Sequence, residues 1–582
     1  MAQALLAIAA GVVPVLAGVL TKLLVDRLAG PDSGRLGTVI GLGLGLALTG
    51  VAVATLPHLL GRVESDWRRA VAVRAQADLY AAVNRLPGLG RLEDPAFRDH
   101  LNLADDAGRH SPIAVTGSAL ELLRGVVTIA GFAGTLALLN PWMVGLLALA
   151  VLPTAHAELR LSRRRAELMW QLSPTERRQF FYAELLTGLA AAKEIRLFDL
   201  GGLFGQRMLT ELRALNAANR RMDRRELFVQ IGLAVVGAVV AGVGLVWAIL
   251  AARGGRLSVG DVTIFIAAVA GIQGAVANGI SRLAIAHEGL LRFTHYREVL
   301  TCTPDLALPA DPMPVRPLHG RVELRDVWFR YADGHPWVLR GVDLTIPRGR
   351  TVAVVGLNGA GKSTLVKLLV RFYDPVRGSV LWDGVDYREL DVSGLRDRIG
   401  ATFQDFMSYD LSAAENIGVG DVSTLDDPER IVTAARWAGV HDALTALPHG
   451  YATQLTRIFA DPADRDDAAT GVLLSGGQWQ RLALARSFLR ADRDLLILDE
   501  PSAGLDAEAE ADLQQRLRGL REGRTTLLIS HRLGTVRDAD RIVVLRDGAV
   551  AEQGNHDELM AAQGEYARLF NLQAAGYQPV AG

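Results

Sequence analysis

Cysteine is almost absent from this sequence of 582 residues, which contains only Cys302. A single thiol excludes an intramolecular disulfide and any metal site built from several cysteines. Lysine is also scarce, with four residues among 62 lysines and arginines together. A formal net charge of −1 carries no sign of nucleic-acid binding, so we expect no nucleic-acid partner.

Long apolar runs, in contrast, dominate the first half of the chain. Crossing a bilayer takes about 20 apolar residues in a helix, and most of the runs reach that length. The fourth is the weakest, because Pro153, His156 and Glu158 follow it closely. We therefore predict an all-α, six-helix transmembrane domain over residues 1–302, in contact with the lipid bilayer, with spans near 4–25, 37–60, 113–139, 142–155, 228–252 and 262–285.

Charge between the apolar runs predicts the orientation. The connections 62–109 and 160–225 are rich in arginine, whereas the other three are short and weakly charged. Arginine-rich connections stay on the cytoplasmic side, so we expect both ends of the chain to be cytoplasmic. The first run lacks a basic leader and a cleavage-like site, which favours a membrane helix over a signal peptide. We expect a multi-pass protein of the cell membrane, meaning the plasma or inner membrane.

A proline-rich stretch separates the two halves of the chain. Residues 303–318 contain five prolines, which interrupt helices and suit a linker. The remaining residues, 319–582, are predicted to form a soluble domain.

The soluble half opens with the motif GLNGAGKST at 356–364, between a predicted strand, 351–355, and a predicted helix, 365–370. Glycines at such a turn let backbone N–H groups converge on phosphates at a helix N-terminus. Lys362 is expected to reach the β and γ phosphates, and Ser363 to hold Mg²⁺. We predict a site for ATP and Mg²⁺ formed by Gly356, Asn358, Gly359, Ala360, Gly361, Lys362, Ser363 and Thr364.

Four polar residues downstream complete the set expected of an ATPase. An apolar strand, 494–500, ends in Asp499, expected beside the metal, and Glu500, the candidate general base. His531 follows a second buried-strand pattern and is expected to contact the γ-phosphate, although a core histidine is the alternative. Gln404 follows the apolar run 399–403 and is expected to bind Mg²⁺ or to orient the attacking water.

The segment LSGGQ, at 474–478, begins a second predicted helix with a phosphate-binding N-terminus. One nucleotide needs only one cradle, so the extra element suggests a head-to-tail dimer. In such a dimer Ser475, Gly476 and Gly477 of one chain cap the γ-phosphate held by Lys362 of the other. Gln478 completes the segment expected to bind nucleotide.

The order and approximate spacing of these motifs resemble those of ATP-binding-cassette (ABC) proteins, and the six preceding spans resemble half-transporter exporters of that superfamily. The resemblance implies a multidomain fold, with the helical membrane domain followed by an α/β P-loop nucleotide-binding domain that has a helical subdomain. It also implies that Tyr331 stacks on adenine and that Asp506 lies in the loop linking two ATP sites. Two cytoplasmic loops, around 91–109 and 183–200, would contact the ATPase domains; EDPAF, at 93–97, is similar to a family segment in the first.

Two departures from the family pattern stand out. The segment 456–473 is long and acidic, and it lacks the glutamate-glycine motif that usually precedes LSGGQ. It is either a solvated loop or, through Asp466 and Asp467, an ion-paired contact to the arginine-rich loops. Ala503 and Gly504 replace the serine and alanine common in exporters.

These features predict an ATPase coupled to transport. The leading hypothesis is export of an amphipathic compound, a drug, lipid or peptide, by alternating access in a dimer with two composite ATP sites. The alternatives are one half of a heterodimer, an importer that uses the exporter fold, and an ATP-gated channel or regulator. The complete ATP-site set favours a homodimer. Polar residues within the spans either line a substrate cavity or bond between helices: Ser118, Thr128, Gln273 and Asn278.

Overall fold

The computed structural model describes residues 2–29, 36–139, 141–456, 458 and 471–575. The chain divides into two compact units. Met1–Val83 and Asp99–Cys302 make up the first, and Asn84–Arg98 and Thr303–Gly582 the second. The short segment Asn84–Arg98 therefore packs with the C-terminal unit, although the chain on both sides of it belongs to the first.

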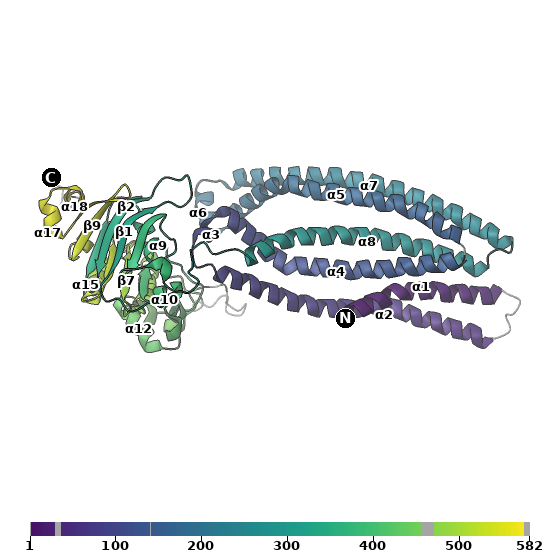
Figure 1. Cartoon of the computed structure of the whole chain (residues 1–582), viewed down its shortest axis with the longest axis horizontal. Coiled ribbons are helices and arrows are strands. Elements are labelled where there is room, and N and C mark those ends of the chain that lie inside the picture. The colour runs from purple at the N-terminus through teal and green to yellow at the C-terminus, as the bar shows by residue number, and fades with distance from the viewer. Residues whose placement is uncertain (1, 30–35, 140, 457, 459–470, 576–582) are drawn as a thin grey trace. The chain divides into compact units, whose positions relative to one another are not determined.

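The first unit consists of long helices that run along a common direction (Figure 1). Five of them contain a stretch long and apolar enough to span a membrane, namely α1, α2, α4, α7 and α8, counted among the described residues. The fourth predicted span falls within α5, where several side chains lie outside the described set. The bounds are α1 Ala2–Ala29, α2 Leu36–Asn84, α4 Pro95–Leu139, α5 Pro141–Thr187, α6 Leu189–Leu197, α7 Gly201–Arg253 and α8 Val259–Leu300.

These helices continue well beyond their apolar stretches. In α2 the helix runs through the arginine-rich region that follows the second apolar run. Ion pairs between residues four apart stabilise this polar half, including Arg68 with Glu64 at 3.3 Å and Arg74 with Asp78 at 3.1 Å. Much of the charged connection predicted from the sequence is thus regular helix.

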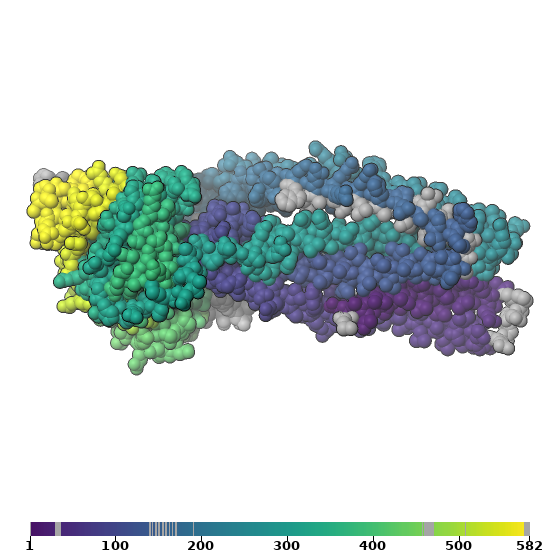
Figure 2. All heavy atoms as spheres, viewed as in Figure 1, coloured from purple at the N-terminus to yellow at the C-terminus, as the bar shows by residue number. Residues whose placement is uncertain are grey.

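Side chains from α4, α7 and α8 form a core within the first unit. It includes Phe132, Ala248 and Phe265, each at most 2% exposed. In Figure 2, which draws all heavy atoms, the atoms of α4 and α8 adjoin on the face in view. On α7, by contrast, Val239 and Val243 are exposed, an apolar surface suited to lipid.

The second unit contains two β-sheets. The first has four strands in the order β2-β1-β4-β5, with β1 antiparallel to both β2 and β4. The second has six strands in the order β10-β9-β3-β8-β7-β6 and is parallel except for β10 at its edge. The strands are β1 Arg321–Phe329, β2 Leu339–Pro347, β3 Thr351–Val355, β4 Arg377–Trp382, β5 Val385–Asp386, β6 Ile399–Thr402, β7 Leu495–Asp499, β8 Thr526–Ile529, β9 Arg541–Arg546 and β10 Ala549–Gly554.

Helices pack around these sheets and also form a group of their own. Contacts join α11, α12 and α14 to one another and α12 to α13, which corresponds to the expected helical subdomain. The helices of this unit are α3 Gly90–Glu93, α9 Lys362–Leu369, α10 Val392–Asp397, α11 Ala413–Gly418, α12 Pro428–Trp437, α13 His441–Thr445, α14 Gly476–Phe488, α15 Ala507–Arg521, α16 Leu533–Val536, α17 His556–Ala561 and α18 Glu565–Ala575.

Parallel pairing brings the polar residues that follow three strands to one edge of the larger sheet. Strand β3 pairs with β8, and β8 pairs with β7, all in the same direction. The carboxyl ends of parallel strands meet at one edge, where α/β proteins bind ligands. The turn after β3, the carboxylates after β7 and the histidine after β8 therefore converge.

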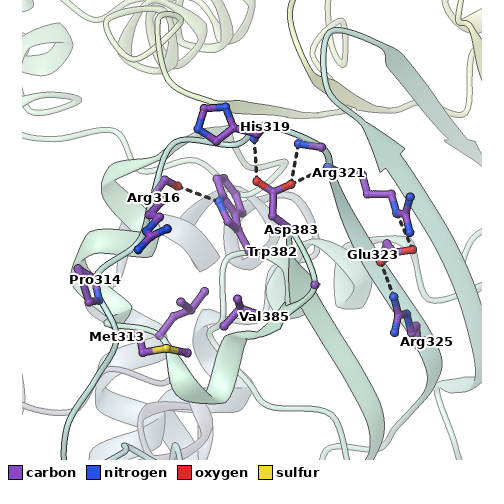
Figure 3. Close-up of a pocket in the computed structure, with 13 residues that line it drawn as sticks. Met313, Pro314, Arg316, His319, Arg321, Glu323, Arg325, Trp382, Asp383 and Val385 are labelled. Atoms are coloured by element: carbon purple, nitrogen blue, oxygen red, sulfur yellow. Dashed lines mark hydrogen bonds and ion pairs between the residues drawn. The ribbon is translucent and has the colours of Figure 1, made fainter.

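A surface cavity of about 770 Å³ lies beside β1 and β4 in the second unit (Figure 3). Part of its charged lining is paired internally: the Glu323 carboxylate binds the guanidinium groups of Arg321 at 2.8 Å and Arg325 at 2.7 Å. Asp383 accepts backbone N–H bonds from His319, Gly320 and Arg321 at 2.7–2.8 Å. Burial opposes ionisation of Asp383, but these three bonds outweigh it and hold the pKa of the carboxyl below its ordinary 3.8.

Replacing Asp383 by asparagine is expected to destabilise the second unit at neutral pH by about 1–2 kcal/mol, a value reduced by solvent screening at this exposed site. Because folding lowers this pKa, the carboxylate's contribution is fully present above its unfolded-state pKa of about 4. It is lost as the pH falls through the lower folded-state value. Denaturant unfolding of the full chain in detergent, measured from pH 7 to pH 3, tests both effects.

Asp547→Asn is a matched control for this experiment. Asp547 has φ 51°, close to the 50° of Asp383, but its side chain is 85% exposed and lies 3.7 Å from Arg546. Asparagine tolerates this left-handed backbone at both positions. Equal effects of the two substitutions would contradict the role given to the three backbone bonds.

Candidate active site

The phosphate-cradle motif forms the turn between β3 and α9, as the sequence predicts. Gly356, Gly359 and Gly361 have φ values of 155°, 82° and 102°. A Cβ on Gly361 would lie 2.6 Å from Cδ2 of Leu339, and one on Gly356 would lie 2.3 Å from the carbonyl oxygen of Leu545. Side chains at these two positions would force the turn open, so backbone conformation and close packing both require glycine.

Lys362 begins α9 and is 7% exposed. Its ammonium donates hydrogen bonds to the carbonyl oxygens of Gly356 at 2.8 Å and Leu357 at 3.0 Å, both within the cradle. Burial lowers the pKa of Lys362, against the opposing effects of the Glu500 and Asp499 carboxylates. The ammonium is thus held inside the turn. A bound phosphate would replace the two carbonyl oxygens as its hydrogen-bond acceptor.

Asp499 ends β7 and is 3% exposed. Burial and the neighbouring Glu500 carboxylate raise the pKa of Asp499 to about 6, and the Lys362 charge and a hydrogen bond with Ser363 oppose the shift. A carboxylate hydrogen-bonded to a hydroxyl at the start of α9 provides the hard oxygen donors that Mg²⁺ prefers. The residues present therefore fit this ion.

Glu500 adopts a left-handed backbone conformation, with φ 48°. Its N–H donates to the carbonyl oxygen of Ile529 at 2.8 Å, and the Gln480 side chain donates to its carbonyl oxygen at 3.2 Å. A non-glycine residue rarely adopts this conformation, which is found mainly where the surroundings impose it, as at functional sites. Here the bonds with Ile529 and Gln480 hold the backbone in this conformation, and they thereby fix the direction of the Glu500 carboxylate.

Three of the polar residues predicted for the site meet at this carboxylate. The Gln404 amide donates to Oε2 of Glu500 at 3.0 Å, and Nδ1 of His531 lies 3.1 Å from Oε1. Glu500 itself is 8% exposed, whereas the His531 side chain is 48% exposed. Glu500 is therefore a buried carboxylate whose histidine neighbour is more accessible to solvent. Such a carboxylate is suited to accept a proton from a bound water.

Tyr331 lies just beyond the end of β1, where its hydroxyl is 3.0 Å from Oγ1 of Thr364 in the cradle. Its ring packs against those of Phe329 and Tyr373 in T-shaped geometry. With 42% of the residue exposed, an aromatic face remains accessible beside the cradle. The arrangement is compatible with stacking on a base.

Two other predicted ligands, Asp506 and Ser475, cap the starts of helices. Asp506 caps α15, where its carboxylate accepts the N–H of Ala509 at 2.8 Å. Ser475 caps α14 in a capping box with Gln478, in which each side chain accepts the backbone N–H of the other. Ser475 and Gly476 are exposed. Asn358 is also exposed, in the turn before α9.

Some neighbours of the site were not anticipated. Gln480, inside α14, donates to the carbonyl oxygens of both Glu500 and Pro501. Lys367 and Tyr373 contact the Tyr331 ring. A polar residue at an otherwise apolar position of a predicted helix could have indicated Gln480, whereas nothing in local spacing points to the other two. Asp466 and Asp467 of the acidic segment lie outside the described residues.

Comparison with known proteins agrees with this architecture. The family model described as "ABC transporter" matches residues 339–503. The chain is 33% identical over 523 residues to the ATP-dependent lipid A-core flippase of Chromohalobacter salexigens, a match that covers 88% of this chain and 84% of that protein. It is 34% identical over 476 residues to the flippase of the same name from Alkalilimnicola ehrlichii, covering 80% and 76%.

Among solved structures, a bacterial Atm1-family ABC exporter with ATP bound has a TM-score of 0.81 and 24% sequence identity, covering 99% of this chain and 98% of that one. At that identity the match establishes the fold. The similarity to the flippases is higher and covers most of the chain. It shows that the chain belongs to the ABC transporter family. It is a multi-pass membrane protein that binds ATP and couples its hydrolysis to transport, which confirms the predicted fold class and enzymatic class.

Proposed function

We propose that the protein is an exporter that works as a homodimer with two composite ATP sites. The observation that carries this proposal is the single complete catalytic group around Glu500 together with a second phosphate-binding helix start at Ser475. Within the chain, Ser475 forms hydrogen bonds with Gln478 of the same helix start. Its exposed position leaves it open to a nucleotide held by a partner's cradle.

The local geometry supports the following roles in each composite site. Lys362 and the cradle N–H groups bind the phosphates, and Ser363, Asp499 and Gln404 hold Mg²⁺, which would neutralise the developing phosphate charge. Glu500 accepts the proton of the attacking water. His531 contacts the γ-phosphate.

Two further contacts complete the proposed arrangement of nucleotides in the dimer. Tyr331 stacks on adenine, and Asp506 lies in the loop that joins the two sites. Closing of the dimer around ATP and its release after hydrolysis would drive alternating access.

For the cargo we propose an amphipathic compound, a lipid, drug or peptide. Both flippases to which the chain is similar carry lipid A-core in their names, and a lipid is the member of this class that such a likeness favours. Within the first unit, two candidate polar residues form bonds between helices: Thr128 donates to the carbonyl oxygen of Gly11 at 3.1 Å, and Asn278 donates to Glu121 at 3.1 Å. These contacts favour packing roles over substrate binding.

Orientation in the membrane is proposed from charge. The arginine-rich helical extensions and the ATPase unit lie in the cytoplasm, with the N-terminus on the same side, in the plasma or inner membrane. Export from the cytoplasmic leaflet or cytoplasm then requires that inverted vesicles accumulate cargo when given external ATP. Loss of preloaded cargo from such vesicles would instead favour the importer alternative.

Cysteine cross-linking tests the head-to-tail dimer directly, because replacing Cys302 by serine leaves a cysteine-free chain. We expect Asn358→Cys and Ser475→Cys, placed on two separately tagged chains, to form an intermolecular disulfide in lipid when ATP is added. Chains that both carry only Asn358→Cys serve as the matched control and are expected to stay uncross-linked. Absence of the mixed disulfide in a sample that binds ATP would contradict the homodimer and leave a heterodimeric partner as the alternative.

A further inference from the structure

The segment Asn84–Arg98, which links α2 to α4, is attached to the C-terminal unit by backbone contacts. The N–H of Leu89 donates to the carbonyl oxygen of Phe372 at 3.1 Å, and the Arg396 guanidinium donates to that of Pro87 at 2.5 Å. Main-chain bonds of this kind fix the path of a segment without regard to its side chains. The position of Glu93, at the end of α3, is thereby set.

The Glu93 carboxylate binds two donors from the region around α9. Oε1 lies 2.7 Å from the Lys367 ammonium, and Oε2 accepts the Tyr373 hydroxyl at 2.5 Å. Burial opposes ionisation of Glu93, but these two hydrogen bonds prevail and lower its pKa. Burial and Glu93 raise the pKa of Tyr373, so at neutral pH the phenol keeps its proton and donates it to the carboxylate.

Both donors also contact the ring of Tyr331. The Lys367 ammonium lies 5.2 Å from the centroid of that ring, within the range of a cation–π interaction. The Tyr373 ring lies 5.4 Å from it, at an interplanar angle of 89°. Phe329 supports the Tyr331 ring at 5.0 Å, and the hydroxyl of Tyr331 is tied to Thr364.

The Glu93 carboxylate holds in place the two groups that, with Phe329, surround Tyr331. Lys367 has a flexible four-carbon stem, and its ammonium needs a fixed partner to stay over the aromatic ring. Without the carboxylate, Lys367 would turn toward solvent and the Tyr373 hydroxyl would lose the acceptor that holds it. The Tyr331 ring would then sample more orientations, which costs binding energy when it must stack on a base.

We propose that Glu93 is a positioning residue for the nucleotide base: through Lys367 and Tyr373 it orients Tyr331, so that affinity for the adenine part of ATP depends on the segment that links α2 to α4. The inference rests on the proposed role of Tyr331 as the adenine-stacking residue. It adds a specific energetic link from a segment of the helical half of the sequence to recognition of the base, separate from the phosphate chemistry at Lys362 and Glu500.

Binding of two probes to the full chain in detergent without Mg²⁺ tests this link. ATP carries the base, whereas inorganic tripolyphosphate carries only the phosphates. We expect Glu93→Gln to weaken ATP binding about three- to tenfold, the size of a lost cation–π contact and its ordering. Tripolyphosphate affinity is expected to stay within about twofold, because the cradle does not touch Glu93.

The matched control is Asp94→Asn in the same segment. The Asp94 carboxylate accepts the N–H of Ala96, a bond that asparagine can also accept. ATP affinity should therefore be unchanged. Tyr373→Phe is a second, milder variant, which keeps the ring and removes only the hydroxyl bonded to Glu93; we expect it to weaken ATP binding in the same direction.

Tyr331→Ala separates failure of the inference from failure of the proposed function. If this substitution leaves the preference for ATP over tripolyphosphate unchanged, Tyr331 does not bind adenine and the base site itself is wrongly assigned. If it removes the preference, Glu93→Gln added to Tyr331→Ala should have no further effect on ATP binding. A full Glu93 effect in that double variant, an equal loss of tripolyphosphate binding, or no effect of Glu93→Gln and Tyr373→Phe would each overturn the positioning role.

Discussion

Replacing Glu500 by glutamine is expected to reduce ATP hydrolysis by the full-length protein in lipid by about 10²- to 10⁴-fold, the range of a lost general base. Glutamine matches the shape of glutamate and can still accept the 3.0 Å bond from Gln404. It cannot accept a proton from water. Binding of ATP should therefore persist while turnover stops, and measurement of phosphate release together with equilibrium ATP binding separates the two effects.

The left-handed backbone at Glu500 strengthens this expectation. The contacts with Ile529 and Gln480 hold that conformation through main-chain atoms, which the substitution does not alter. Glu508→Gln in the first turn of α15 is the matched control, because Glu508 is exposed and lies eight positions further along the chain. Residual hydrolysis above about one-tenth of the unmodified protein would exclude Glu500 as the main base.

Loss of the Lys362 ammonium is expected to have the second large effect. Lys362→Ala should weaken ATP binding by about 30-fold or more, the cost of removing one partner of a buried, hydrogen-bonded charge contact with phosphate. Lys362→Arg should not restore it. The position is 7% exposed, and the ammonium fits between two carbonyl oxygens at 2.8 and 3.0 Å, where a planar guanidinium is too large.

Lys193→Ala tests whether the loss follows from this site or from the removal of any lysine. Lys193 is exposed in α6, and ATP affinity should be unaffected by its replacement. Tripolyphosphate is the better probe here, since Lys362 acts on phosphate rather than on the base. Unchanged binding of that probe by Lys362→Ala would be incompatible with the proposed cradle.

The elements that carry the candidate site could largely be predicted because their signals are local. The strand before the cradle was expected at 351–355 and β3 occupies those residues, whereas α9 begins at Lys362, three residues before the expected helix. The predicted strand 494–500 contains β7, and the buried-strand pattern that precedes His531, at 525–530, contains β8. Short apolar runs bounded by glycine or carboxylates specify buried strands well, since length and flanking residues are both informative.

Features that depend on distant parts of the chain could not be predicted in the same way. The sequence predicts the arginine-rich regions as connections, but α2, α4, α5 and α7 continue through much of them. Ion pairs along α2 and between α5 and α7 contribute to the stability of these extensions. The left-handed conformation of Glu500 depends on β8 and α14. No neighbouring residue signals it.

The sequence by itself determined the class of this protein, its membrane and ATPase halves, and the residues of the proposed phosphate cradle, because each is encoded in contiguous apolar runs or short motifs. Only the tertiary structure decided which side chains surround these residues. Glu93 and Lys367 are 274 positions apart, yet their charges meet at 2.7 Å. Such a pair forms when the chain closes a long loop and packs a segment onto a distant surface, and the driving force is spread over many contacts that no local pattern records.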